Sequence, residues 1–253
     1  MLKFGDLMTN EWLKMYKKKS FFIPFAIMAV FIGICTYVAA RYMDGFGSAT
    51  EFAEFFVSMG TAGQLLPIIA IIAIANIVPQ EYRFGTIKFL LIRSQSRNKI
   101  LASKYATVVL YCITLILTTL LLALIAGFGL YGFGGSGEGW AAIGENTLYL
   151  FAYTLVFATL AFMIGVLTKS NGATIGITML SMMIGGLVTM LLSKYAFTKY
   201  ILFPNVDLSV YAGEAAQPPL KGMSLTFSSV VLAAYIIVFL LASFVVFRKR
   251  DVS

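Results

Sequence analysis

The sequence contains no histidine and only two cysteines, Cys35 and Cys112. Without imidazole, the usual histidine general bases, histidine-dependent triads and common zinc sites cannot be built. Both cysteines fall in apolar runs, where cysteine acts as a small apolar residue, and the acidic residues are scattered over different loops. We therefore expect no catalytic residues, no bound cofactor and no metal site in this chain.

Phosphate-binding motifs are also missing. No G-x-x-x-x-G-K-[ST] sequence is present, so the chain has no P-loop of its own for ATP. Residues 127–132 match G-x-G-x-x-G, but they lie at the end of a long apolar run instead of between a strand and a helix. We interpret them as a flexible turn and not as a dinucleotide site.

Charged residues are few, at 12% of the chain, whereas 60% of residues are hydrophobic and the mean hydropathy is +0.89. Six runs lack Asp, Glu, Lys and Arg, and each is long enough to cross about 30 Å of hydrocarbon as a helix. Their continuous apolar character does not fit the alternating strands of a barrel. The sequence predicts an all-α integral membrane protein, a single domain over residues 1–253. Its six transmembrane helices are expected at residues 21–40, 55–78, 106–130, 147–167, 172–192 and 225–247.

Lysine and arginine predict the orientation, because they concentrate on the cytoplasmic side of membrane proteins. With both termini in the cytoplasm, fifteen of the nineteen cations lie inside and four outside. We therefore expect cytoplasmic N and C termini. Most of the net charge of +8 then lies at the cytoplasmic surface of the bilayer, where it attracts anionic lipid. We therefore expect no nucleic-acid partner.

The stretch PQEYRFGTIKFLLIRSQSRNKILASK, residues 79–104, holds six cations between the second and third apolar runs. Burying them in hydrocarbon would cost on the order of 15 kcal/mol, so the stretch belongs in the cytoplasm or at its boundary. Pro79 and Glu81 suit the first turn of a helix. Ser96 is placed to N-cap a second helix that continues through Lys104 into the third span. We expect a short transverse helix hinged to a membrane helix.

This stretch resembles the signature of the type-2 ABC transporter permeases, which runs as Glu, three variable residues, Gly-Thr, a Leu-rich helix, Pro-x-Ser-Arg, Ile-Leu and a final Lys. The chain departs from it at Ser94, where the family usually has proline. The remainder of the chain resembles the family more loosely, in its amphipathic start, six spans and long loop before the last span. The matching positions are Glu81, Gly85, Thr86, Leu90, Leu91, Ser96, Arg97, Ile100, Leu101 and Lys104.

The resemblance implies a permease subunit of an ABC exporter in a bacterial plasma membrane. Residues 79–104 would form the coupling helix that docks a separate P-loop ABC ATPase, present in two copies and carrying the ATP and Mg. A second permease subunit, identical or homologous, would complete the transporter, so this chain is not itself the enzyme. Drugs, amphipathic peptides or peptide antibiotics are the expected substrates. The docking and coupling residues implied are Glu81, Arg83, Gly85, Thr86, Leu90, Arg97 and Lys104.

Residues 1–19 form an amphipathic pattern, with Phe4, Leu7, Met8, Trp12 and Met15 on one helical face. Trp12 and the cluster Lys17, Lys18 and Lys19 suit a helix lying in the membrane interface. By resemblance this is the elbow helix beside the coupling helix. A plain membrane anchor is an equally good interpretation.

The fifth run contains small residues that allow close helix contact: Gly172, Gly176, Ser181 and Gly185. Packing within the chain is one interpretation, and a dimer interface or transport pathway is the other. The extracellular loop 193–224 is too long for a simple turn and either re-enters the membrane as a cap or forms an aromatic belt. We expect kinks at Pro24 and Pro67.

None of the six runs carries an ionisable residue, so a driving force from outside the chain is the simpler inference. Two other classes of function stay open. One is a secondary transporter or channel that works without an ATPase. The other is a membrane scaffold or sensor, in which the loop 79–104 is a positively charged segment facing lipid.

Overall fold

The computed structural model describes residues 4–42, 46–84, 96–212 and 218–249, and all regular structure in these ranges is helical. The N-terminal half comprises α1 (Phe4–Tyr16), α2 (Lys19–Tyr42), α3 (Ala49–Val57), the 3-10 turn η1 (Ala62–Gln64), α4 (Leu65–Ile74), α5 (Pro79–Arg83) and α7 (Arg97–Tyr131). The C-terminal half comprises α8 (Gly137–Thr168), α9 (Asn171–Leu192), the 3-10 turns η2 (Ala196–Tyr200), η3 (Phe203–Asn205) and η4 (Leu208–Tyr211), and α10 (Leu225–Lys249).

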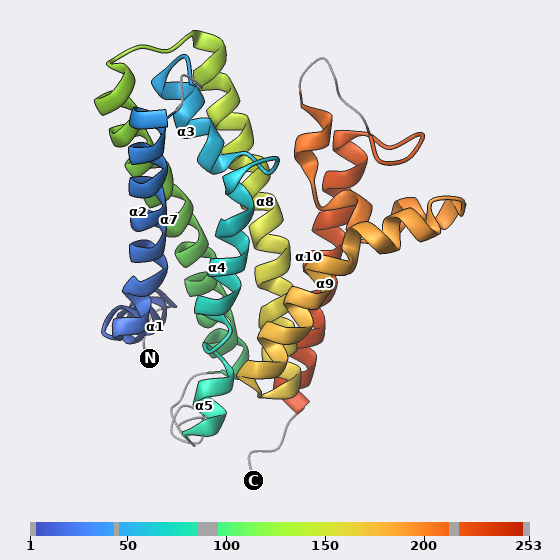
Figure 1. Cartoon of the computed structure of the whole chain (residues 1–253). Coiled ribbons are helices and arrows are strands. Elements are labelled where there is room, and N and C mark those ends of the chain that lie inside the picture. Colours follow the sequence, from blue (N-terminus) through green and yellow to red (C-terminus); the bar gives the residue numbers. More distant parts are fainter. Residues whose placement is uncertain (1–3, 43–45, 85–95, 213–217, 250–253) are drawn as a thin grey trace.

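Six helical segments are long and apolar enough to cross a membrane, which confirms the predicted number of spans. They are α2, the composite Ala49–Arg83, α7, α8, α9 and α10. The helix α1 and the last turn of α10 lie at the same end of the bundle (Figure 1), as an even number of crossings requires.

The helix α8 occupies the middle of the bundle. On one side it packs against α3, α4 and α7, and on the other against α9 and α10 (Figure 1). The helix α9 leans away from the remainder of the bundle and leaves large apolar side chains uncovered, among them Met183 at 81% exposed and Leu191 at 75%. Such a surface is stable in hydrocarbon but not in water, in agreement with a membrane protein.

The second span is interrupted, which the sequence did not predict. In place of one helix over residues 55–78, α3 ends at Val57 and α4 begins at Leu65, with η1 between them. The chain turns so tightly here that a Cβ at Gly63 would lie 2.4 Å from the Ser58 carbonyl oxygen. Pro67 therefore sits in the first turn of α4, after the break, and Pro24 lies inside α2.

A close helix contact explains part of the G-x-G-x-x-G match. The flexible turn expected over residues 127–132 is helical as far as Tyr131, and only Gly132 has a positive φ, at 75°. A Cβ at Gly127 would lie 2.9 Å from the Ala49 carbonyl oxygen, so glycine lets α7 and α3 touch.

The loop predicted at 193–224 is folded against the helices in its described part. Leu202, Val206 and Leu208 share a buried cluster with Ile71 and Phe157. The buried amide of Asn205 donates to the carbonyl oxygens of Lys199 (2.9 Å) and Ile201 (2.7 Å), which fixes the turns η2 and η3. Tyr195, Phe197 and Tyr200 of the same loop are exposed, so the cap and the aromatic belt both stay predictions.

Candidate functional site: a buried ion-pair network at the α1 end of the bundle

The helix α1 turns its apolar face toward the bundle, as its pattern predicts. Leu7, Met8, Trp12 and Met15 are half-buried there, whereas Phe4, predicted on the same face, is exposed. Glu11 lies on the same face and is buried, at 8% exposed. A buried carboxylate needs a cation close by, and this cation comes from a distant part of the chain.

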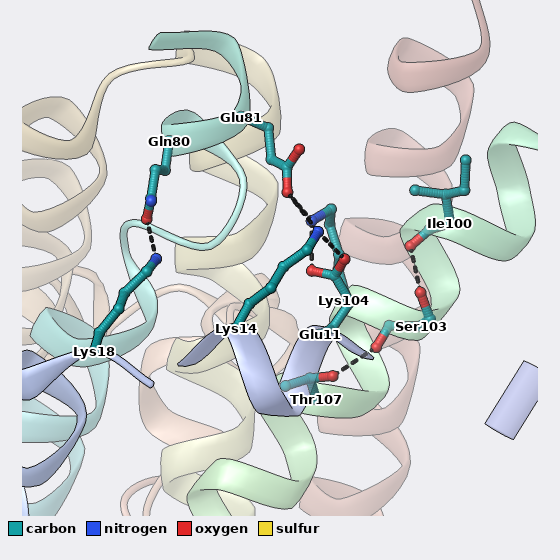
Figure 2. Close-up of polar contacts among 9 residues, drawn as sticks. All are labelled: Glu11, Lys14, Lys18, Gln80, Glu81, Ile100, Ser103, Lys104 and Thr107. Atoms are coloured by element: carbon teal, nitrogen blue, oxygen red, sulfur yellow. Dashed lines mark hydrogen bonds and ion pairs between the residues drawn. The ribbon is translucent and has the colours of Figure 1, made fainter. Parts of the chain in front are cut away.

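Lys104 supplies that cation from the second turn of α7, where it is only 2% exposed. Its ammonium lies 2.6 Å from Glu11 Oε2 and 2.8 Å from Glu81 Oε1. Figure 2 shows the three side chains converging from α1, α5 and α7. The nearby hydroxyls of Ser103 and Thr107 donate to carbonyl oxygens of α7, at Ile100 and Ser103, and not to the carboxylates.

Lys14 completes the network from the exposed side of α1. Its ammonium donates to Glu11 Oε1 at 2.7 Å and to Glu81 Oε1 at 3.3 Å (Figure 2). Burial by itself lowers the pKa of Lys14, but the hydrogen bonds and negative charges of Glu11 and Glu81 outweigh it, so its pKa lies above the usual value. One turn further, the Lys18 ammonium donates to the Gln80 side chain.

Two carboxylates and two ammonium groups therefore balance in charge, and they join three elements that are far apart in sequence. Glu11 and Lys104 are separated by 93 residues, and Lys14 and Glu81 by 67. Removing one member of a buried pair costs about 3–5 kcal/mol, because the other charge is left without compensation. The network thus holds α1 and α5 in one arrangement against α7.

The helix α5 also contacts the other half of the bundle. The Lys169 ammonium, in the turn between α8 and α9, lies 4.7 Å from the centre of the Tyr82 ring. A Cβ at Gly165 of α8 would lie 3.4 Å from the Pro79 ring. Pro79 is at the start of α5, as predicted. This short helix is therefore in contact with both halves of the molecule.

The predicted docking residues occupy different environments. Glu81 and Lys104 are buried in the network, whereas Arg83 is exposed and its guanidinium lies 4.9 Å from the ring of Phe84, itself 61% exposed. Arg97 donates to the Arg248 carbonyl oxygen at 3.1 Å, which links the start of α7 to the end of α10. Gly85, Thr86 and Leu90 lie outside the described residues, so the predicted transverse helix is described only at its two ends.

Two local predictions are confirmed at this end of the bundle. Ser96 N-caps α7 by accepting a hydrogen bond from the Lys99 amide. The helix then runs through Lys104 into the third span, as predicted. It begins at Arg97, nine residues before the apolar run 106–130, and so includes Lys99 and Lys104. In the same way the second span, from Ala49, includes Glu54, which accepts from Asn146 of α8.

Trp12 packs edge-on against Phe21 of α2, with ring centroids 5.4 Å apart, which fixes the bend between the two helices. Lys17, Lys18 and Lys19 are exposed around this bend. Such a basic, aromatic surface suits a membrane interface.

The small residues of α9 do not share one environment. A Cβ at Gly185 would lie 2.8 Å from the Phe203 ring, so this position packs within the chain. Gly172 and Gly176 have open space at their Cβ positions, and Ser181 donates to the Ile177 carbonyl oxygen of its own helix. A dimer or pathway role for this helix stays a prediction.

Glu11 is the residue that the sequence analysis missed. The signal for it was an acidic residue on the apolar face of α1, together with a lysine two residues before an apolar run. Neither position indicates its partner by itself.

Within the described ranges, no group of three or more His, Cys, Asp or Glu side chains is placed to hold a metal ion, and both cysteines are free thiols.

Comparison with known proteins places the chain in a family. A family model described as "Protein of unknown function (DUF2705)" matches residues 20–253. The chain belongs to this family. Two relatives come from Bacillus subtilis (strain 168). "Uncharacterized protein YhcI" is 35% identical over 221 residues, which cover 81% of this chain and 68% of the relative.

The second relative, "Uncharacterized membrane protein YdbK", is 30% identical over 247 residues, covering 95% of this chain and 99% of the relative. Its name agrees with the six candidate spans found here. The family model starts after α1, at residue 20, and therefore includes α2, from its second residue, to α10.

Proposed function

We propose that this chain is the membrane-spanning permease subunit of an ATP-driven ABC exporter. A separate ATPase, in two copies, would bind at the α1 end of the bundle, and a second permease subunit would complete the pathway. Drugs, amphipathic peptides or peptide antibiotics are the proposed substrates. The proposal includes cytoplasmic termini in a bacterial plasma membrane, from the distribution of cations.

The observation that carries the proposal is the arrangement around α5. A short helix with an exposed Arg83 and Phe84 is tied by a buried ion-pair network to α1 and α7. A force applied to the exposed residues would be transmitted to the spans, because separating α5 from α7 would break the Glu81–Lys104 pair. Glu81 and Lys104 would then act within the chain, and Arg83 and Phe84 at the surface that meets the ATPase.

The test has two steps: to look for a P-loop ABC ATPase encoded beside this chain's gene, and to reconstitute the chain with that ATPase. We expect the pair to associate, ATP hydrolysis to be stimulated, and an amphipathic peptide to be moved in liposomes only when ATP and both proteins are present. Arg83→Glu should abolish the stimulation. Lys194→Glu, at an exposed lysine just after α9, is the matched control.

A secondary transporter is the second candidate, and the buried carboxylates favour it. Glu11 and Glu81 are ionisable groups at the end of the spans, and such groups bind coupling protons in some transporters. This function would give solute accumulation by the chain alone, driven by a proton gradient without nucleotide. That result would refute the proposed exporter.

A further inference from the structure

A cavity of about 980 Å³ lies beside the ion-pair network, between α1, α2, α4, α5 and α7. Its two ends differ in chemistry. Lys14, Lys17, Lys18 and Gln80 line one end, whereas the other is lined by apolar side chains of α2 and α4 such as Ile27 and Ile72. A cavity of this size with one polar and one apolar end suits an amphiphile.

The polar end carries an excess of positive charge. Glu11 and Glu81 line it but are balanced by Lys14 and Lys104. Lys17 and Lys18 add two cations that this network does not neutralise, and Lys18 reaches across the cavity to Gln80 (Figure 2). An anionic group is therefore the complementary partner.

The apolar end opens where hydrocarbon would surround the bundle. Ile23, Ile27 and Ile72 line the cavity and are also about half exposed, at 54%, 49% and 47%. They belong to α2 and to the second span. An alkyl chain can therefore pass between α2 and α4 without crossing a polar surface.

Tyr111 provides an independent sign of a missing partner. Its side chain is fully buried and lines the cavity from α7, yet its hydroxyl has no hydrogen-bond partner among the residues that the structure describes. A buried hydroxyl without a partner is unfavourable. Tyr111 lies seven residues beyond Lys104, about 10 Å further along the helix. It is therefore placed deeper in the membrane than the lysines and can donate to an ester oxygen.

We propose that this cavity binds one anionic phospholipid from the bilayer leaflet in which α1 lies. Its phosphate would lie against Lys17 and Lys18, an ester oxygen would accept from the Tyr111 hydroxyl, and its acyl chains would lie between α2 and α4. The bound lipid would touch α1, α2 and α5 together, and so would brace the ion-pair network. This site does not depend on the proposed exporter function.

The test measures lipid binding to the purified full chain. The protein is delipidated in mild detergent and titrated with phosphatidylglycerol or with phosphatidylcholine of the same acyl chains, and bound lipid is counted by native mass spectrometry. We expect one tightly bound phosphatidylglycerol. The double variant Lys17→Gln, Lys18→Gln should weaken it about thirtyfold, since each lysine near a membrane surface contributes roughly a fivefold preference.

Matched variants separate this site from general attraction to anionic lipid. Lys194→Gln, Lys221→Gln removes the same charge from exposed positions that do not line the cavity and should leave the tight site unchanged. Tyr111→Phe should weaken both lipids by the same factor, because both carry ester oxygens. Equal binding of the two lipids by the natural chain would overturn the proposal. So would equal losses in the two lysine double variants, or full displacement by an amphipathic peptide, which would make the cavity a substrate site.

Discussion

Replacing Lys104 with methionine tests the ion-pair network directly. Methionine has a similar length and keeps the packing, but it removes the ammonium that contacts Glu11 and Glu81 at 2.6 and 2.8 Å. The two carboxylates, whose side chains are 10% and 11% exposed, then lose one of the positive charges that compensate them. Such a loss costs about 3–5 kcal/mol.

This cost should appear as opening of α1, because its other contacts with the bundle are fewer than those of the spans. Hydrogen exchange of the chain in nanodiscs measures the opening. A loss of about 3 kcal/mol corresponds to roughly a hundredfold larger open population, so amides of Phe4–Tyr16 should exchange about a hundred times faster. Lys99→Met is the matched control, since Lys99 is exposed on the same helix five residues earlier.

A double-mutant cycle adds a sharper condition. Adding Glu11→Gln to Lys104→Met leaves the neutral pair of Lys14 and Glu81, at 3.3 Å. The double variant should therefore be less destabilised than the two single changes predict together, by about 1–3 kcal/mol. Strict additivity, or exchange in Lys104→Met no faster than in Lys99→Met, would show that the network does not hold α1.

Three further changes test other parts of the structure by thermal unfolding or local exchange. Gly127→Ala should destabilise the chain by about 1–3 kcal/mol, because its Cβ would lie 2.9 Å from a backbone oxygen. Gly129→Ala, with open space at its Cβ, should be neutral or stabilising, and equal effects of the two changes would disprove the close contact. Asn205→Ala should cost about 1–3 kcal/mol and speed exchange in the turns η2 and η3, whereas exposed Asn98→Ala should do neither. Ser96→Ala should cost about 1 kcal/mol at the start of α7, and Ser96→Asp should restore it; no recovery would argue against the cap.

The sequence was informative wherever the determining chemistry is local. About twenty consecutive apolar residues are needed to cross hydrocarbon, so all six spans could be found from their composition. Ser96 and Pro79 mark helix starts because a cap or a fixed φ acts within one turn. The amphipathic pattern of α1 likewise needs only its own residues.

The features that were missed depend on contacts between distant residues or on turns without charge. The partner of Glu11 lies 93 residues away, so no pattern in the sequence around Glu11 could identify it. The break in the second span was hidden because Ser58, Gly60, Thr61 and Gly63 are uncharged and lie within a stretch that scans as one apolar run.

The separation between Glu11 and Lys104 also orders events during biosynthesis. The ribosome makes α1 before α7, so the lysine that neutralises the buried glutamate of α1 emerges 93 residues later, about 5 to 20 s at ordinary rates of translation. Until the third span is inserted, α1 has its contact with α2 through Trp12 and Phe21 but lacks the cation for its buried glutamate. The final docking of α1 therefore has to wait for α7, and a nascent chain truncated before Lys104 should leave α1 accessible to protease.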